Sequence, residues 1–425
     1  MTQNASTFRG LKTIVLIWLG WAILMLAYQA VAPIRLPMQR PDNATNFSAS
    51  ETAPDSLRDR PYLGRESLLG THVAWDSQYY LSIALHGYRD PVMPAVSPES
   101  TRDAPRSGPQ GQHPDWPSVN AAYFPAYPIA MGLLARPLMW LGLAPIAAAT
   151  LAGVLLSLAG ALGATLAIAD LTATDREDER ARAGAYLLIW PAAAFLAQVY
   201  TEGVFVGLSF GALAMLRRRR WAWAAVLAVL ATWTRANGAL LLIPFAWTWL
   251  QDGGLQRLQD RETRRDAVLS LILGGAPAFA YLAWRLLLGD GFEYVEGHYF
   301  GRGMLEIGQS WRSFLDALDL VVNGAPQAAV YYGAEAASFL AALLCSLVLW
   351  RRDRSLALYG LAILAVALTS GAVLGFPRYV LAVPALFLVP ARWGRSLVFD
   401  RLWTLACILG LGVWTLAFAA GFWDG

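Results

Sequence analysis

Charged residues, histidine and cysteine are all scarce in this chain. Charged side chains make up 15% of its 425 residues, and it has four histidines and two cysteines. Ordinary soluble domains carry roughly 25% charged residues, so this composition excludes that class. The two cysteines, Cys345 and Cys407, both lie in apolar stretches. We therefore interpret them as buried thiols with no role in a disulfide or a metal site.

Motifs for nucleotide and metal chemistry are missing as well. The sequence contains no GxGxxG, P-loop or HExxH pattern and no pair of cysteines at metal-ligand spacing. Its net charge is only +3, and of its 33 basic residues only Lys12 is a lysine. We therefore expect no cofactor, no bound metal and no nucleic-acid partner.

Long apolar stretches are what the chain does contain. Hydrophobic residues make up 56% of the sequence, and stretches of about 20 apolar residues recur, enough to cross a hydrocarbon core of roughly 30 Å. The first, Leu11–Pro33, is too long for the apolar part of a signal peptide, and no A-x-A-like cleavage site accompanies it. The sequence predicts an all-α, polytopic integral membrane protein with about 11 transmembrane helices, the first within residues 1–33.

Arginines set the orientation of these helices. Arg9 and Lys12 precede the first helix, which places the N-terminus in the cytoplasm by the positive-inside rule. Two longer loops then face outside, at residues 34–141 and 289–326, and residues 142–425 form a multi-span transmembrane domain. The dense basic clusters outside the first loop all face the cytoplasm, at residues 172–182, 217–220, 257–265, 351–354 and 392–395.

Three parts of this topology are irregular. The helices between Tyr200 and Leu250 are short for a span, so neighbouring helices must cover their ends. Residues 93–117 are rich in proline and polar residues, which predicts a flexible excursion with little core of its own. Tyr123–Leu141 contains three prolines and an internal arginine, which favour an interfacial or re-entrant helix over a span.

The segment WDSQYYLSIALHGY, residues 75–88, combines a carboxylate with aromatic residues in the first external loop. A helix here places Asp76, Tyr79 and Tyr80 on one face, with His72 one turn earlier. An acid beside stacking surfaces at a membrane interface indicates sugar chemistry on a lipid-borne substrate. The alternative interpretation of Asp76 is a solvated loop carboxylate or a helix cap.

Isolated charged residues elsewhere emerge on the same external side. Glu202 lies in VYTEG, Arg235 lies in the turn TRANG, and Arg378 follows Phe-Pro at another outer turn. Ionisable groups at membrane depth cost roughly 3 kcal/mol or more, so they usually face a bundle interior or a wet cavity. Together with Asp76 these residues predict one site. The alternatives are a structural ion pair between Glu202 and Arg235, and an Arg378 that reaches to the headgroups.

The residue types indicate the chemistry of this site. Nucleotide sugars stay in the cytoplasm, so an external site requires an activated lipid-linked sugar, whose phosphate is an anionic leaving group. We expect Arg235 and Arg378 to clamp that phosphate, and Asp76 to accept the acceptor's proton as general base, with inversion at the anomeric carbon. Further predicted substrate-binding residues are Trp75, Tyr79 and Tyr80 on the sugar faces, Glu202 on a sugar hydroxyl or an arginine, Tyr379, and His298 in the second external loop.

Four segments together resemble a known family. AWDSQYYLSIALHGY, AYFPAYPIAMGLLARPL, VYTEGVFVGLSFGALAMLRRRRWAWAAVLAVLATWTRANGALLLIP and FPRYVLAVPALFL occur in the order seen in the phosphatidylinositol-glycan class V-type mannosyltransferases. The resemblance implies a GT-C fold, a catalytic acid in the first external loop, a polyprenyl-phosphate sugar donor, and mannose as the sugar. AWD and YFPAY depart from the family's usual residues without removing a reactive group. Residues 93–117 are a less typical insert, which leaves the acceptor open.

Two other functional classes stay open. A transporter or flippase of polyprenyl-linked or other amphiphilic lipids also places charges in the membrane, but it predicts inverted repeats and paired broken helices, and we find no convincing repeat. A non-catalytic membrane subunit is the third class. We expect the partners to be a polyprenyl-phosphate sugar donor, a lipid or glycan acceptor and membrane lipids. The expected location is the plasma membrane in a bacterium, which the composition favours, or the endoplasmic reticulum membrane in a eukaryote.

Overall fold

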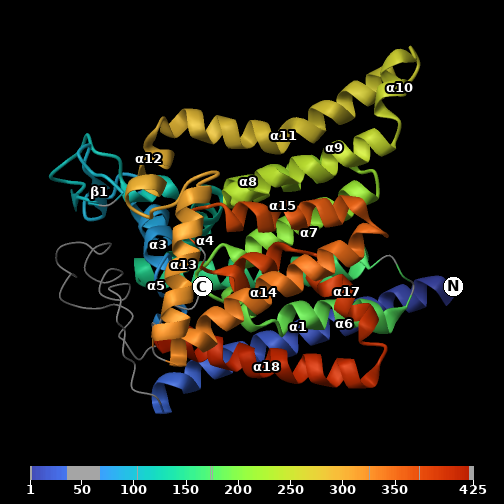
Figure 1. The fold of residues 1–425 in the computed structure, drawn as a ribbon, viewed down its shortest axis with the longest axis horizontal. Helices are drawn as coiled ribbons and strands as arrows, with labels where there is room; N and C mark the ends of the chain where they lie inside the picture. Colours follow the sequence, from blue (N-terminus) through green and yellow to red (C-terminus); the bar gives the residue numbers. More distant parts are fainter. Residues whose placement is uncertain are drawn as a thin grey trace.

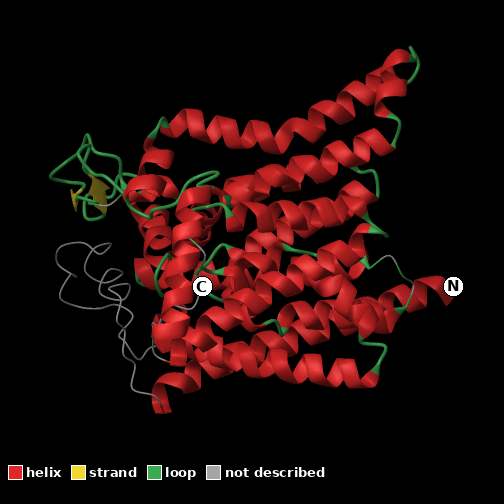
Figure 2. Ribbon diagram, viewed as in Figure 1, coloured by secondary structure: helices red, strands yellow, loops and turns green. Residues whose placement is uncertain are grey.

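The fold is helical in nearly every part that the structure describes. The computed structural model describes residues 2–35, 68–102, 104–172, 174, 176–324, 326–372 and 374–420. Figure 2 shows helices throughout, with one small two-stranded sheet. The prediction of an all-α protein is confirmed.

Among the described residues, five helices are long and apolar enough to cross a membrane, which confirms a multi-pass membrane protein. Their apolar cores read as continuous hydrophobic stretches in the sequence, with polar residues mainly at the ends. They are α1 (Thr2–Arg35), α5 (Pro145–Leu171), α11 (Arg264–Leu288), α14 (Pro326–Trp350) and α18 (Leu397–Ala420).

The other predicted spans are short or broken helices. The 3₁₀ helix η4 and helix α7 meet at a bend of 97° and pass the length test only as a pair. Neighbouring helices pack against the short elements, α7 between α5 and α8 and α9 against α11 and α15, which is how their ends stay out of lipid. These elements are α6 (Glu177–Leu188), η4 (Pro191–Ala197), α7 (Glu202–Arg217), α8 (Trp221–Thr234), η5 (Ala236–Leu241), α9 (Leu242–Gln251), α15 (Arg354–Leu368), α16 (Phe376–Tyr379), η6 (Val380–Ala382) and α17 (Ala385–Trp393).

The remaining elements lie at the ends of the bundle. In Figure 1 the N-terminus and α10 lie at one end, while the β-strands and α12 lie at the other, and α13 crosses the direction of the long helices. Which of these two ends faces outside stays a prediction from the arginines. These elements are η2 (Gly70–His72), α3 (Ser77–His86), β1 (Pro94–Val96), β2 (Ser107–Pro109), η3 (Val119–Ala122), α4 (Ala126–Trp140), α10 (Gly254–Gln259), α12 (Gly291–His298) and α13 (Ile307–Asn323).

Glycines let the backbones of α5 and α7 come into direct contact. A Cβ atom at Gly203 would collide with the carbonyl oxygen of Ser157, and one at Gly207 would collide with that of Gly160. Spaced small residues are a common way for membrane helices to pack this closely. Because Glu202 begins α7 next to Gly203, this contact fixes the depth and direction of the Glu202 side chain.

The prediction of a flexible excursion at residues 93–117 is wrong. Strands β1 and β2 form an antiparallel hairpin over this segment, and Met93 and Val96 are fully buried. The amide nitrogen of Gln110, also buried, donates to the carbonyl oxygens of His113, Pro114 and Trp116. Local side-chain hydrogen bonds thus replace the large apolar core that the composition lacks.

Helix α4 corresponds to the segment expected to be interfacial or re-entrant. It is 15 residues long, contains Pro137, and packs against α3 and α5. Its position relative to a bilayer stays a prediction.

Candidate active site

The carboxylate of Asp76 stands at the start of α3 and not on its face. Trp75 has a left-handed backbone with φ of 49°, and the helix begins at Ser77 with Asp76 as its N-cap residue. His72 belongs to the separate 3₁₀ helix η2, so the expected shared helical face does not exist. The left-handed backbone of Trp75 separates η2 from α3, which a pattern of helical spacing does not reveal.

His72 has a structural role. It is fully buried, and its Nδ1 atom lies 2.7 Å from Oε1 of Gln198 and 3.1 Å from the carbonyl oxygen of Ala197. Burial lowers the pKa of His72 to about 4. The ring is therefore neutral at pH 7 and ties the loop before α3 to the chain that follows η4.

Asp76 is held on several sides and remains partly open. The hydroxyl of Tyr123 donates to its Oδ1 atom over 3.2 Å, and Nη1 of Arg378 lies 3.6 Å from Oδ2. Its backbone N–H donates to the hydroxyl of Tyr200 over 3.1 Å. The Asp76 side chain is 24% exposed. The carboxylate is thus positioned by its neighbours, yet one side of it can be reached.

Arg378 joins Asp76 to a second carboxylate. Its Nε atom lies 3.3 Å from Oε1 of Glu202, and the same oxygen pairs with Nη1 of Arg235. The Arg378 and Glu202 side chains are only 4% and 2% exposed. Within the described residues, Oε2 of Glu202 has no hydrogen-bond partner. The structure therefore brings together the two carboxylates and two arginines that the sequence placed at outer helix turns.

The aromatic residues of α3 face other aromatic residues. The ring of Tyr79 stacks on that of Tyr123 with centroids 4.7 Å apart, and Tyr80 meets Tyr123 edge-on at 5.2 Å. Both α3 tyrosines are buried, and burial raises their pKa values above the usual range. Their expected role on sugar faces does not match this arrangement, in which they pack the wall behind Asp76. Trp75 is half-buried and packs against the core.

Tyr379 lies at the centre of three guanidinium groups. Its ring centroid is 5.6 Å from the guanidinium carbon of Arg235, 5.8 Å from that of Arg378 and 6.0 Å from that of Arg302. Nη1 of Arg302 also donates to the Tyr379 hydroxyl over 2.5 Å. Arg302 comes from the second external loop, and the sequence analysis did not select it.

The second external loop also supplies a carboxylate that the sequence analysis missed. Glu296, in α12, lies in the electrostatic field of Arg302, Asp76 and Arg235, and burial raises its pKa to about 7. His298, the residue that was predicted from this loop, lies two residues after Glu296. That ring stacks on Tyr294 of its own helix at 4.2 Å, and its Nδ1 atom lies 2.9 Å from the Tyr294 carbonyl oxygen. Within the described residues, these two contacts of His298 stay inside its own helix and do not involve the Asp76 cluster.

The part of the cluster around Glu202 and Arg235 encloses little space. A cavity of about 10 Å³ is lined by Glu202, Phe205, Val206, Arg235, Asn237, Arg378, Tyr379 and Ala382. Such a volume holds about one water molecule, so a sugar enters only after side chains separate. Among the described residues no group of three or more His, Cys, Asp or Glu side chains is arranged to hold a metal ion. The fold and the site define a multi-pass membrane protein with a buried carboxylate–guanidinium centre at one end of its bundle.

Comparisons with known proteins find relatives among mannosyltransferases. The chain is 31% identical over 226 residues to GPI alpha-1,6-mannosyltransferase 2 of Mus musculus, covering 52% of this chain and 39% of that protein. It is 32% identical over 222 residues to the Rattus norvegicus protein of the same name, covering 51% of this chain and 38% of that protein. These comparisons confirm the resemblance indicated by the sequence motifs. The match spans less than two fifths of each relative's length.

Two further comparisons complete this picture. No family model matches the chain. Among solved structures, the archaeal oligosaccharyltransferase AglB from Archaeoglobus fulgidus, in complex with an inhibitory peptide and a dolichol-phosphate, aligns with a TM-score of 0.42 and 14% identity. That alignment covers 95% of this chain and 56% of AglB. A similarity of this size carries no information on function.

Proposed function

We propose that this chain is a membrane glycosyltransferase that moves a mannosyl group from a polyprenyl-phosphate donor to a lipid-linked or cell-envelope acceptor. The observation that supports this most directly is the buried guanidinium of Arg378 between the carboxylates of Asp76 and Glu202. Mannose is the sugar in the names of the mouse and rat relatives, both mannosyltransferases. The proposed organisation has the first span in residues 1–33, the external loops at 34–141 and 289–326, and the multi-span domain at 142–425.

The donor phosphate binds among the three guanidinium groups. Arg235, Arg302 and Arg378 surround the Tyr379 ring, and guanidinium matches phosphate oxygens in a bidentate manner. Three cations face two carboxylates, Asp76 and Glu202, so the cluster retains one positive charge while Glu296 is neutral. A phosphodiester carries one negative charge, which balances this excess. Phosphate binding then replaces carboxylate contacts with Arg378.

The transfer is a direct displacement at the anomeric carbon. The acceptor oxygen forms a bond to that carbon, its proton passes to a carboxylate oxygen of Asp76, and the bond from the carbon to the phosphate oxygen breaks. The electron pair of that bond leaves with the polyprenyl phosphate, whose added negative charge the guanidinium groups stabilise. Attack opposite the leaving group inverts the anomeric configuration. Tyr123 orients the Asp76 carboxylate for this step.

A transfer assay with two donors tests the proposal. The purified chain in detergent receives radiolabelled polyprenyl-phosphate mannose and a lipid extract of the host as acceptor, and parallel samples receive GDP-mannose. We expect labelled glycolipid from the first donor only. Product from GDP-mannose alone would place the site in the cytoplasm. A transporter or a non-catalytic subunit would give no labelled glycolipid from either donor.

A further inference from the structure

Helix α14 contains a buried carboxylate, Glu335, outside the set of residues that carry the proposed transfer reaction. Glu335 is the tenth residue of this 25-residue helix, which is long enough to cross a membrane, and it is only 3% exposed. It is the only charged residue in the sequence from 326 to 350. A carboxylate at membrane depth is costly, so such residues usually face a bundle interior and serve a function there.

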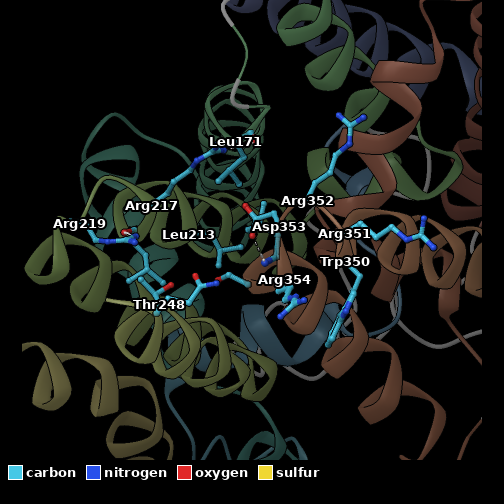
Figure 3. A pocket seen from close by; sticks show the side chains of 14 residues that line it. Leu171, Leu213, Arg217, Arg219, Thr248, Trp350, Arg351, Arg352, Asp353 and Arg354 are labelled. Atoms are coloured by element: carbon cyan, nitrogen blue, oxygen red, sulfur yellow. Dashed lines mark hydrogen bonds between the residues drawn. The ribbon is translucent and has the colours of Figure 1, made fainter. Parts of the chain in front are cut away.

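Charged residues at the end of the bundle opposite Asp76 do not need such an explanation. A polar cavity of about 340 Å³ lies there, and five of its lining residues are arginines. In Figure 3 the side chains of Arg351 and Arg352 point away from the cavity and from each other, and both residues are exposed. Their charges lie at the surface, whereas the charge of Glu335 has to be stabilised inside the protein.

Two consecutive backbone N–H groups stabilise Glu335. Its Oε1 atom accepts the N–H of Gly375 over 2.9 Å, and its Oε2 atom accepts the N–H of Phe376 over 2.7 Å. Hydrogen bonds to an ionised carboxylate are roughly twice as strong as those between neutral groups. Both N–H groups lie at the start of α16, where no carbonyl of the same helix can accept them. One side chain thus satisfies two of these donors.

The turn bound by Glu335 leads directly to the Asp76 cluster. Gly375 has φ of 86°, a left-handed conformation that residues with a Cβ atom rarely adopt. Arg378 and Tyr379 follow within the same four-residue helix, α16. Because so short a helix has few hydrogen bonds of its own, its direction depends on the contacts that hold its start.

Other elements hold the same turn from different sides. The ring of Phe376 meets that of Phe339, one turn after Glu335 on α14, edge-on with centroids 5.1 Å apart. Nε1 of Trp190, just before η4, donates to the carbonyl oxygen of Pro377 over 2.9 Å. The two bonds to Glu335 involve an ionised group, so we expect them to fix the turn more strongly than these neutral contacts do.

We propose that Glu335 is a positioning residue, which holds the start of α16 so that Arg378 reaches the donor phosphate. This inference rests on the proposed function, in which Arg378 binds that phosphate. Glu335 acts through the backbone of α16 and not by contact with the donor. Loss of its two bonds lets the turn relax and moves the Arg378 guanidinium, so donor binding weakens.

Glu335→Gln in the full chain, purified in detergent, is the test variant. Glutamine keeps the size of the side chain, but its amide nitrogen cannot accept an N–H, so one of the two bonds is lost. The matched control is Ser338→Ala in the same helix, a buried position whose hydroxyl donates to the carbonyl oxygen of Ala334. If Glu335→Gln does not fold, Glu335→Asp replaces it, because it keeps both acceptor oxygens on a shorter side chain.

Hydrogen exchange measured by mass spectrometry tests the contact without any substrate. Peptides over residues 374–383 report the turn, and peptides of α5 report global opening. We expect exchange of the turn to be faster by about tenfold or more in Glu335→Gln, with α5 unchanged, and to change by less than about twofold in Ser338→Ala. Unchanged exchange in the turn would overturn the proposal.

A double-mutant cycle with Arg378→Lys tests whether Glu335 acts through Arg378. The dissociation constant of polyprenyl-phosphate mannose is measured for the wild type, each single variant and the double variant. We expect Glu335→Gln to raise this constant by about tenfold when Arg378 is present, and by less than about twofold when lysine replaces it. A purely structural role weakens binding by the same factor in both backgrounds, which would overturn the proposal.

The failure of this inference is distinct from the failure of the proposed function. A wild-type chain that neither binds polyprenyl-phosphate mannose nor transfers its sugar would overturn the proposed function, and the role of Glu335 with it. A wild-type chain that does both, with no coupling between Glu335 and Arg378, would overturn only the role of Glu335. Faster exchange in the turn together with coupling in the cycle supports both.

Discussion

Nη1 of Arg378 lies 3.6 Å from Oδ2 of Asp76, although the two residues come from the far end of the chain and the first external loop. The same guanidinium contacts Glu202, so its charge is shared by two carboxylates. A donor phosphate competes for this guanidinium. On binding, it frees an Asp76 oxygen to accept a proton, which couples donor binding to activation of the base under the proposed function.

Arg378→Lys keeps the positive charge and removes the planar fork that can contact two oxygens at once. We expect donor affinity and turnover both to fall, with kcat/KM lower by about tenfold or more. Steady-state kinetics and donor binding measured on the same preparation check this. Arg261→Lys, at an exposed cytoplasmic position, is the control and should match wild type. Unchanged donor affinity in Arg378→Lys would remove Arg378 from the phosphate site.

Glu296 predicts a pH dependence of donor binding. Burial raises its pKa to about 7, so the group is neutral below that pH and becomes an anion above it. The anion adds negative charge beside Asp76 and repels the donor phosphate. We expect kcat/KM of the wild type to fall as pH rises through about 7. In Glu296→Gln the group stays neutral, and this fall should disappear. A wild-type-like decline in the variant would show that another group titrates.

Gly203→Ala tests the close contact of α5 with α7. The added Cβ collides with the Ser157 carbonyl oxygen, so we expect a loss of about 1–3 kcal/mol in stability and a lower thermal midpoint. Transfer should fall too, because Glu202 is the neighbouring residue. Gly20→Ala in α1 is the control, since nothing lies within 4 Å of a Cβ there. The thermal midpoint in detergent, with and without donor, measures both variants. A midpoint equal to that of the control would contradict the packing account.

Much of the bundle follows from the sequence, because apolar length and arginine placement are local signals. The short helices predicted between Tyr200 and Leu250 are present, with α8 among them, and the turns with Glu202, Arg235 and Arg378 do converge near Asp76. A common side for these turns was predictable, because the number of spans between two turns decides whether both face the same side of the membrane.

Other parts depend on contacts that no local pattern encodes. Arg302 and Glu296 enter the cluster only because the second external loop folds back onto Tyr379. The start of α3 is shifted by the left-handed backbone of Trp75. The hairpin at residues 93–117 is held by side-chain bonds of Gln110. In each case a specific contact or backbone conformation overrides composition or helical spacing.

Membrane sidedness gives a further prediction. Ser107 and Arg261 are both exposed, and both native cysteines are buried. We expect Ser107→Cys to react with an impermeant thiol reagent from outside in intact cells, and Arg261→Cys to react only after permeabilisation. Labelling by a mass-shifting maleimide reads this out. The opposite pattern would place the Asp76 cluster in the cytoplasm and favour a nucleotide-sugar donor.

The most direct test of the central claim is the single-turnover rate of mannosyl transfer from polyprenyl-phosphate mannose by Asp76→Asn. Asparagine keeps the size and the hydrogen bond from Tyr123 but cannot accept a proton at neutral pH. The account predicts a rate at least about 10²-fold below wild type, with donor affinity no weaker than that of the wild type. A transfer rate close to that of the wild type would contradict the assignment of Asp76 as general base.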